Sequence, residues 1–419
     1  MSLAPSRGVR LEVVAPLLAC GLVFAVATWA AEPYPVGIFH DDGVYATLAK
    51  ALATGEGFRY LNLPGAPVAT HYPPVYPLLL ALQWKLAPDF PANIPVLQVL
   101  NAFALALTAW GVMSFGRKIL EWPVSATAAA ALVGTLSYPL LGLSGHLLSE
   151  TLFAAALFPA LIVGERSMHS SRADDAWIAG AVAGVLTLVR THGVALAAAL
   201  VLVLLLHRQW RRAAFVAGGV VLVLVPWQLF LMAHDDQVTG VLRGKYAGYL
   251  PWLLEGLRGG AGFVIATMIA NVREVQALLA DRFSLSDHMA PRFVTGIAAT
   301  VVAAGGAVRL WRRAPVTVAF AAFYLVILLL WPYTPWRFLY AVWPVVILCM
   351  AAMVQWLLEL RPRDAVAAGA GLAVIAALAL GVLREEYRAY RDRAWYQPAK
   401  RATEAVAPVI RWVGEHTAP

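Results

Sequence analysis

The sequence predicts an all-α protein that crosses a membrane about eleven times. Of its 419 residues, 61% are hydrophobic and only 13% are charged, and the mean hydropathy is +0.70. Soluble domains are about one quarter charged, so this composition excludes an ordinary soluble protein. Apolar runs also recur along the chain, most of them near the length of about 20 residues that a helix needs to cross the hydrocarbon core.

The predicted spans follow those apolar runs in order. The first run is longer than the core of a signal peptide and lacks a convincing cleavage site, so it is taken as a span. The full set occupies residues 11–31, 94–115, 124–140, 149–165, 176–190, 193–207, 213–232, 292–310, 315–331, 338–358 and 365–383.

Basic residues give the predicted orientation, because clusters of Arg and Lys at span ends face the cytoplasm. With the clusters inside, the N-terminus is inside and the membrane domain is 1–383. A first outer loop is predicted at 32–93, a second large outer loop at 233–291 and an outer tail at 384–419. The net charge of +8 is then a topology signal, and nucleic-acid binding is not expected.

Cysteines and nucleotide motifs narrow the function further. Cys20 and Cys349 both lie in apolar runs, so no disulfide framework or zinc ribbon is expected. The chain has no Walker loop and no glycine fingerprint for a dinucleotide, which argues against an ATP-driven pump.

Two predicted spans, 176–190 and 193–207, are unusually short. At 1.5 Å per residue each reaches only about 22 Å, so they must meet below the outer surface. The turn from Arg190 to Gly193 is therefore predicted to be sunk within the protein. Such a turn is tolerated only where it lines a polar cavity.

The most informative polar feature is the acidic pair Asp41-Asp42, just beyond the first span. Carboxylates at a membrane boundary are costly and usually mark chemistry or an ion path. Val44 and the leucines after it recur every four residues, which predicts a short surface helix that starts at the pair and ends near Gly55. The alternative is that both acids only cap this helix and complement its dipole.

The rest of the first outer loop is rich in proline. Prolines between Leu63 and Leu80 fix the backbone and delay any regular helix until after Pro77. We expect a stiff wall that presents His71 and Tyr72 toward the acidic pair. The alternative is a proline-braced cover over the helix ends.

At this point the chain resembles the bacterial relatives of protein O-mannosyltransferases and of lipid A aminoarabinose transferase, which are polytopic GT-C glycosyltransferases. Each motif is loose alone, but their order and membrane side together are fairly specific. The residues that carry the resemblance are Asp41-Asp42, Tyr45, Gly55 to Arg59, Pro73 to Pro77, Ser149-Glu150, Arg190, and Trp331-Pro332 through Arg337-Phe338.

The resemblance implies a GT-C fold in the cytoplasmic (inner) membrane of a bacterium, with the active site on the periplasmic face. It implies a polyprenyl-phosphate-linked sugar as donor and a hydroxyl of a lipid, glycan or protein as acceptor. Phosphate leaves without an acid partner, so one carboxylate suffices as general base for an inverting displacement. Asp41 is expected to be the base and Asp42 to orient a sugar hydroxyl or polarise Asp41, although the roles can be exchanged.

The donor's phosphate needs cations, and arginine suits it because its planar fork binds two oxygens. The expected donor-binding residues are Arg59, His71, Tyr72, Arg190, Arg243, Lys245, Tyr249 and Arg337, supported by Tyr45, Glu150 and His192. Three alternatives stay open. Arg190 forms a structural ion pair, with Glu150 as the candidate partner; Arg337 reaches for the membrane interface; or residues 240–249 are a plain solvated loop. No metal site is assigned, and a divalent metal is left open only at the acidic pair.

The chain departs from the family in two places. Its second acid is Asp where relatives often have Glu. Relatives often end in a folded outer domain, whereas Trp412 to Pro419 reads like only the opening helix of such a domain.

Two rival functions are a transporter or lipid flippase and a non-catalytic scaffold. A transporter predicts acids and cations buried in the middle of spans, but these spans are nearly free of Asp and Glu. A scaffold does not explain a proline-stiffened polar loop beside an acidic pair. The sequence therefore favours the glycosyltransferase.

Overall fold

The structure is a computed structural model that describes five stretches of the chain: 7–234, 258, 260–331, 333–360 and 364–417. Helices account for nearly all of the regular structure. Arg59 and Val68 form an isolated antiparallel bridge, and no strand occurs within these five stretches. The predicted all-α class is confirmed.

Most helices follow the predicted apolar runs, and the short helix predicted at the acidic pair is present as α2. Helix α3 was expected only after Pro77 but begins at Val75, because proline is tolerated in the first turn of a helix. The first half contains α1 (Arg7–Ala30), α2 (Asp41–Thr54), α3 (Val75–Leu86), α4 (Ile94–Lys118), α5 (Val124–Thr135), α6 (Tyr138–Ser144), α7 (Glu150–His169), α8 (Ala173–Val189), the 3-10 turn η1 (Thr191–Gly193), α9 (Val194–Leu206) and α10 (Trp210–Met232). The second half contains α13 (Ala261–Phe283), α14 (Met289–Leu310), α15 (Pro315–Leu330), α16 (Trp336–Ala341), α17 (Trp343–Leu358), α18 (Ala365–Asp392) and α19 (Gln397–His416).

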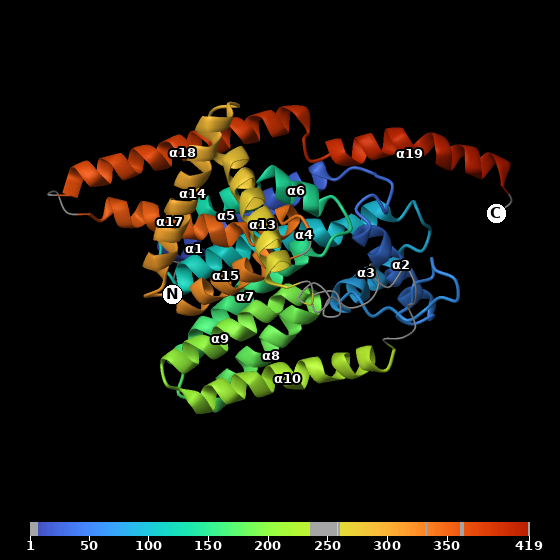
Figure 1. Cartoon of the computed structure of the whole chain (residues 1–419), viewed down its shortest axis with the longest axis horizontal. Coiled ribbons are helices and arrows are strands. Elements are labelled where there is room, and N and C mark those ends of the chain that lie inside the picture. The colour runs from blue at the N-terminus through green and yellow to red at the C-terminus, as the bar shows by residue number, and fades with distance from the viewer. Residues whose placement is uncertain (1–6, 235–257, 259, 332, 361–363, 418–419) are drawn as a thin grey trace, which may run out of the picture.

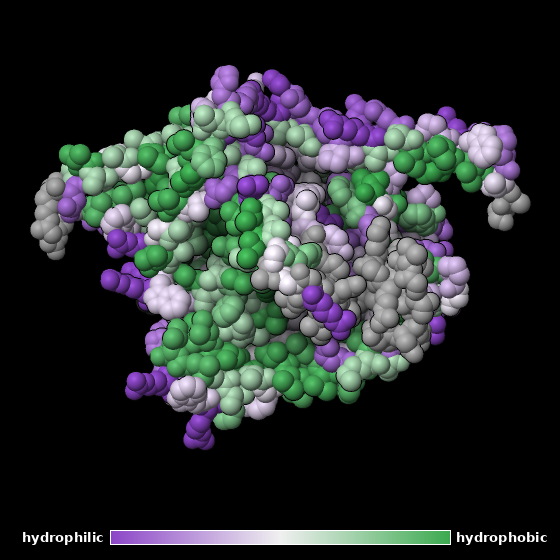
Figure 2. Space-filling view, viewed as in Figure 1, coloured by the Kyte–Doolittle hydropathy of each residue, from purple (hydrophilic) through white to green (hydrophobic). Residues whose placement is uncertain are grey.

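Most long helices lie side by side, and α2 and α3 pack together at the end away from the N-terminus (Figure 1). Helix α10 forms one edge beside α8, and α18 forms the opposite edge beside α13 and α17. Figure 2 shows hydrophobic side chains over much of the flank, with hydrophilic ones gathered toward its borders. Leu18, Leu222 and Val301 are among the large exposed apolar side chains, as expected of a surface that faces lipid.

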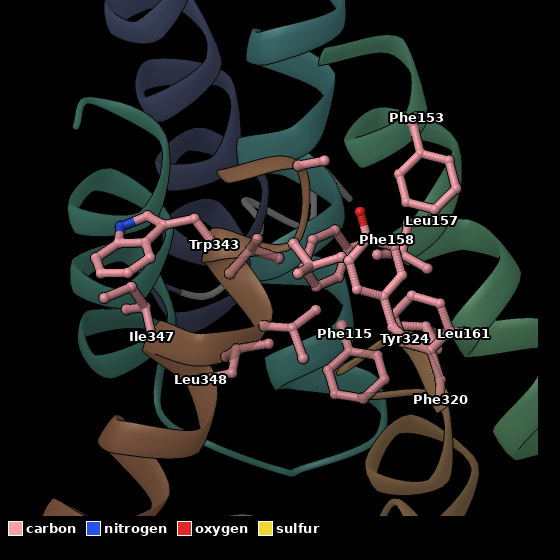
Figure 3. Close-up of a cluster of buried hydrophobic side chains, with 14 of the residues drawn as sticks. Phe115, Phe153, Leu157, Phe158, Leu161, Phe320, Tyr324, Trp343, Ile347 and Leu348 are labelled. Carbon is pink, nitrogen blue, oxygen red and sulfur yellow. The ribbon is translucent and has the colours of Figure 1, made fainter. Parts of the chain in front are cut away.

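Aromatic rings hold the centre of the bundle together (Figure 3). Phe115 of α4 packs against Phe158 of α7 with ring centroids 6.2 Å apart, and Phe320 of α15 lies 5.6 Å from Tyr324. The Tyr324 hydroxyl donates to the carbonyl of Phe338 at 2.8 Å, so its buried polar atom is satisfied. This packing fixes α7 and α15, whose ends carry or flank the polar cluster described below.

Glycine allows a close helix crossing. Gly306 of α14 lies against the backbone carbonyl of Cys349 on α17, where an added Cβ would collide with that oxygen. Small residues let helix backbones approach in this way, and the gain is van der Waals contact along both helices.

The number of spans remains a prediction. Seven described helices are long and apolar enough to cross a membrane, or eight if the bent pair α5–α6 is one span, by length and composition alone. Three shorter apolar helices are Thr191–Leu206, Pro315–Leu330 and Trp343–Leu358. The run 124–140 was expected to be one straight span, but its two helices meet at 63°. Pro139 explains the break, because proline lacks the N–H that a continuing helix requires.

The largest correction concerns α13, which lies inside the segment 233–291 that was predicted to be an outer loop. Its part from Gly262 to Phe283 is long and apolar enough to be a span. Sequence analysis missed it because charged side chains interrupt the apolar run. Arg282 is one of these, yet it is 1% exposed and pairs with Glu386, and its guanidinium lies 4.8 Å from the Tyr138 ring centroid.

Glu386, the partner of Arg282, lies in a part of α18 that extends beyond the predicted span. The predicted span stopped at residue 383, but the helix continues to Asp392. Glu386 pairs with Arg282 and also accepts the backbone N–H of Tyr138 at 3.0 Å. The first turns of the predicted outer tail therefore pack on the bundle.

Two amides on α4 place the start of α7. Gln98 donates to the carbonyls of Glu32 at 2.9 Å and Gly145 at 2.7 Å. Asn101 donates to the carbonyls of His146 at 2.5 Å and Leu148 at 3.0 Å. These bonds satisfy the irregular backbone before α7, so the first residue of that helix has a fixed position.

Candidate functional site

The two adjacent acids at the start of α2 serve different neighbours. The carboxylate of Asp42 accepts the backbone N–H groups of Gly37 at 2.8 Å and Phe39 at 3.0 Å, and the residue is fully buried. Burial raises the pKa of Asp42 more than these bonds lower it. Asp42 closes the turn before α2 and does not line the cavity described below. Its predicted role in orienting a sugar hydroxyl or polarising Asp41 stays a prediction.

Asp41 does face the cavity and is held by three side chains. Its Oδ2 pairs with Nη2 of Arg337 on α16, and its Oδ1 accepts the Tyr72 hydroxyl at 2.8 Å. Nδ1 of His40 lies 3.6 Å from Oδ1. Burial acts to raise the pKa of Asp41, but the hydrogen bond from His40, the charge of Arg337 and the Tyr72 hydroxyl outweigh it. The pKa of Asp41 therefore lies well below its usual value, and the side chain is ionised at neutral pH.

Behind this pair, Glu150 lies between two arginines and is fully buried. Its Oε1 is 3.1 Å from Nη2 of Arg190 and 3.5 Å from Nε of Arg337. Nη1 of Arg190 also donates to Oγ of Ser149 at 2.8 Å, and that Oγ lies 3.0 Å from the Tyr45 hydroxyl. The predicted alternative, an ion pair between Arg190 and Glu150, is thus present.

The cluster balances two acids against two cations: Asp41 and Glu150 against Arg190 and Arg337. Pairing with an opposite charge offsets part of the cost of burying each of these groups. Both carboxylate oxygens of Glu150 and Nε of Arg190 nevertheless have no hydrogen-bond partner among the described residues. Helix ends add to the balance. Glu150 is the first residue of α7 and Arg190 follows the last residue of α8, which are the ends that favour an acid and a cation respectively.

The turn after α8 is buried, as the short flanking helices required. Arg190 is 7% exposed and His192 is 2% exposed. The His192 ring lies 4.4 Å from that of Trp331 and 5.0 Å from that of Phe338, nearly parallel to the second at 19°. Burial, and then the charge of Arg190, lower the pKa of His192 well below its usual value.

These residues surround one cavity of about 380 Å³. That volume lies within the range of small-molecule sites, about 300–1,000 Å³. Its wall combines charged side chains with aromatic ones. The lining residues are Phe39, His40, Asp41, His71, Tyr72, Pro73, Arg190, Thr191, His192, Trp331, Tyr333, Thr334, Trp336, Arg337 and Phe338.

The structure brings most of the predicted site residues together. Those that line the cavity are Asp41, His71, Tyr72, Arg190, His192 and Arg337. Tyr45 and Glu150 stand behind it and contact the Arg190 cluster.

Two groups of predicted residues are not brought to the cavity. Arg59 is exposed, donates to the carbonyl of Ala66 at 3.0 Å within its own loop and does not line this cavity, so its contact with the donor stays a prediction. An arginine in a loop can either bind a ligand or donate to a nearby backbone carbonyl, and no sequence pattern distinguishes these two arrangements. Arg243, Lys245 and Tyr249 lie outside the described residues.

Sequence analysis missed His40 and several aromatic residues of the cavity. His40 has φ of 63°, a left-handed backbone that is uncommon for a residue other than glycine. Its position directly before the acidic pair is the signal that could have found it. Trp336 and Phe338 flank Arg337 and belong to the motif that carried the resemblance, so the same motif could have indicated an aromatic wall.

Within the part of the chain that the structure describes, no three His, Cys, Asp or Glu side chains are grouped to hold a metal ion. The carboxylate that faces the cavity is already paired with a guanidinium. The cavity therefore offers an ionised base, a planar cation that can bind an oxyanion, and aromatic faces.

Comparison with solved structures shows a similar fold in a known membrane protein. No protein family matches the sequence, and no curated protein matches it. The fold is similar to the crystal structure of ArnT from Cupriavidus metallidurans bound to undecaprenyl phosphate, with a TM-score of 0.49 and 17% sequence identity. The match covers 87% of this chain and 63% of that protein, so this chain spans less than two thirds of its length.

Proposed function

We propose that this protein is a membrane glycosyltransferase. It moves a sugar from a polyprenyl-phosphate-linked donor to an acceptor hydroxyl on the outer face of a bacterial cytoplasmic membrane, and it inverts the anomeric carbon. The single observation that carries the proposal is that Asp41 and Arg337 meet at the wall of one cavity. A base for a hydroxyl and a fork for a phosphate are the two groups that this reaction needs side by side.

In the proposed reaction the acceptor oxygen attacks the anomeric carbon from the face opposite the phosphate. The new C–O bond forms as the bond from the anomeric carbon to the phosphate oxygen breaks, and the phosphate leaves with the electron pair. The hydroxyl proton passes to the carboxylate of Asp41. The polyprenyl phosphate is then the second product.

The depressed pKa of Asp41 makes it a weak base while it is paired with Arg337. A donor phosphate that takes the guanidinium of Arg337 removes the strongest single charge holding the Asp41 carboxylate. The pKa of Asp41 then rises toward its ordinary value, and its basicity increases when the donor is in place. Substrate binding and activation of the base are therefore coupled through one arginine.

Glu150 supports this exchange from behind. It is within 3.5 Å of both Arg190 and Arg337, so it stabilises both cations while either turns toward an oxyanion. Ser149 and Tyr45 hold the Arg190 side of the cluster. Two arginines with a shared acid suit a phosphate that gains charge as the sugar departs.

The test uses the full-length protein in lipid nanodiscs with a panel of donors. Radiolabelled glucose, mannose, galactose and arabinose, each linked to polyprenyl phosphate, are incubated with the protein and a membrane extract as the acceptor source. Release of polyprenyl phosphate and appearance of labelled product are measured together. Asp41→Asn should lower the rate about 10²–10⁴-fold, the usual contribution of a general base.

A matched control removes an acid elsewhere in the same loop. Glu56 is exposed just after α2 and does not line the cavity, so Glu56→Gln should retain full transfer. Full transfer by Asp41→Asn would contradict the proposal. Movement of an intact donor across the membrane with no release of polyprenyl phosphate would instead support the rival transporter.

A further inference from the structure

His192 lines the cavity with a buried ring whose two nitrogens make no hydrogen bond within the described part of the chain. It is 2% exposed, and neither ring nitrogen has a hydrogen-bond partner among the residues that the structure describes. Buried polar atoms in folded proteins nearly always have a partner. Because His192 also lines the cavity, its missing partner belongs to whatever occupies that space.

The ring of His192 is held in place by aromatic neighbours. Phe338 stacks on it with centroids 5.0 Å apart, Trp331 lies 4.4 Å away and Tyr324 5.5 Å away. The guanidinium of Arg190 lies 4.9 Å from the Phe338 ring centroid. Packing of this kind fixes the direction of the ring nitrogens, so the side chain is preorganised to bind and not merely a flexible filler.

The charge state of His192 decides the chemistry of its partner. Burial and the neighbouring Arg190 both disfavour the protonated ring, so the imidazole is neutral. A neutral imidazole has one N–H donor and one acceptor nitrogen. A phosphate offers acceptors only and already has two arginines available, whereas a sugar hydroxyl both donates and accepts.

We propose that His192, Trp331 and Phe338 form the subsite for the sugar ring of the donor, with His192 hydrogen-bonded to one of its hydroxyls. This inference rests on the proposed transferase function. The apolar C–H face of a pyranose or furanose ring packs against the indole of Trp331, while Phe338 stays stacked on His192 and holds its ring in place. The phosphate lies toward Arg337, which lines the same cavity.

This assignment makes His192 a specificity-determining residue. A pocket that hydrogen-bonds a particular hydroxyl rejects the analogue that lacks it, because its own polar atom is then left unpaired. A donor lacking the recognised hydroxyl should therefore react at least about 10-fold more slowly in kcat/KM. A donor that lacks a different hydroxyl should show a smaller decrease in kcat/KM, because its hydrogen bond to His192 is intact.

The experiment is a series of monodeoxy donors. The polyprenyl-phosphate sugar that the wild-type protein consumes is compared with its monodeoxy analogues, and kcat and KM are measured for the wild type, His192→Phe and His192→Gln. His192→Phe keeps an aromatic ring in the stack but cannot hydrogen-bond. With this variant, the donor that lacks the hydroxyl recognised by His192 should react as slowly as the parent donor, because neither can hydrogen-bond to residue 192. His192→Gln keeps a donor and an acceptor and should restore much of the discrimination.

A second histidine supplies the matched control. His146 is also buried and packs edge-on against Tyr34 at 4.5 Å and Phe39 at 4.7 Å, but it does not line this cavity. His146→Phe should keep the wild-type pattern of deoxy penalties. Thermal unfolding of each variant confirms that it is folded before its kinetics are compared.

The two levels of the proposal fail differently. If the wild-type protein consumes none of the sugar donors, the proposed transferase function is overturned. If it transfers a sugar but His192→Phe retains every deoxy penalty of the wild type, the function stands and the sugar subsite at His192 is overturned. If His192→Phe does not fold, Trp331→Ala and His192→Gln test the subsite instead. The subsite is supported if Trp331→Ala no longer discriminates between the parent donor and the deoxy donors while His192→Gln still does. It is refuted if Trp331→Ala still discriminates between these donors and His192→Gln does not.

Discussion

Arg337 on α16 pairs with Asp41 at the start of α2, although the two residues are 296 positions apart in the sequence. The same guanidinium lies 3.5 Å from Glu150 at the start of α7. One side chain on α16 therefore joins the starts of α2 and α7. Anything that draws Arg337 toward a ligand changes the charge environment of both acids at once.

Removing Arg337 is expected to impair donor binding. Arg337→Gln removes the fork that binds phosphate, so KM for the polyprenyl-phosphate donor should rise at least about 10-fold, with a further loss in kcat as charge develops on the leaving phosphate. Arg337→Lys retains the positive charge but not the planar guanidinium, so its KM for the donor should lie between those of the wild type and Arg337→Gln. Steady-state kinetics over a range of donor concentrations measures both effects.

Arg59→Gln is the control for this series. Arg59 lies in the same outer loop as Asp41 but caps the carbonyl of Ala66 and does not line the cavity. Its removal should leave KM within about twofold of the wild type, because it touches no proposed substrate group. Equal losses in both variants would show that a general cation effect, and not the Asp41–Arg337 pair, governs donor binding.

Asp42 is expected to be needed for stability and not for chemistry. Asp42→Ala leaves the backbone N–H groups of Gly37 and Phe39 without their acceptor and should lower the free energy of unfolding by about 1–3 kcal/mol. The folded protein should keep most of its kcat. Thermal unfolding in detergent tests the first part and activity per folded molecule the second. A variant as stable as the wild type but inactive would return Asp42 to the catalytic role that the sequence predicted.

The pH dependence of transfer should also change with Arg337. The folded-state pKa of Asp41 lies below its unfolded value near 4, so its ionised form stabilises the fold at every pH above about 4 and this contribution is lost as pH falls through the folded pKa. In the wild type, Asp41 should therefore add no acid limb between about pH 5 and pH 8. Arg337→Gln removes the charge that depresses this pKa and should move the acid limb of kcat/KM to higher pH. An identical pH profile in both proteins would contradict the coupling.

The contact between α14 and α17 gives a prediction about the fold alone. Gly306→Ala places a methyl group against the carbonyl of Cys349 and should destabilise the protein by about 1–3 kcal/mol. Gly369→Ala on α18 has nothing within 4 Å of the new methyl and should stabilise its helix by about 0.5–1 kcal/mol. Thermal unfolding of the pair measures both. A stabilised Gly306→Ala would mean that the two helices separate without cost.

Much of the fold could be read from the sequence because its signals are local. Apolar length predicted helices at α1, α4 and α10, and a four-residue repeat ended by Gly55 predicted α2. The buried turn at Arg190 followed from the shortness of the two runs around it. Helix α13 escaped because Arg282 and its other charged residues broke the apolar run, and the partner that neutralises Arg282 lies on a helix more than a hundred residues later.

The candidate site likewise has features that local sequence patterns predicted and features that depend on contacts between distant segments. The residue types and their order in the chain predicted that an acid, arginines and a stiff aromatic loop would form one polar site, because composition and apolar length can be read along the chain. Which acid faces the cavity was decided only by tertiary structure. Asp41 and Asp42 are adjacent and have the same side chain, but segments far apart in the sequence surround them. Asp42 accepts the backbone N–H of Gly37, whereas Asp41 pairs with Arg337. A carboxylate's role depends on what lies within about 4 Å of it, and that distance is set by packing and not by sequence.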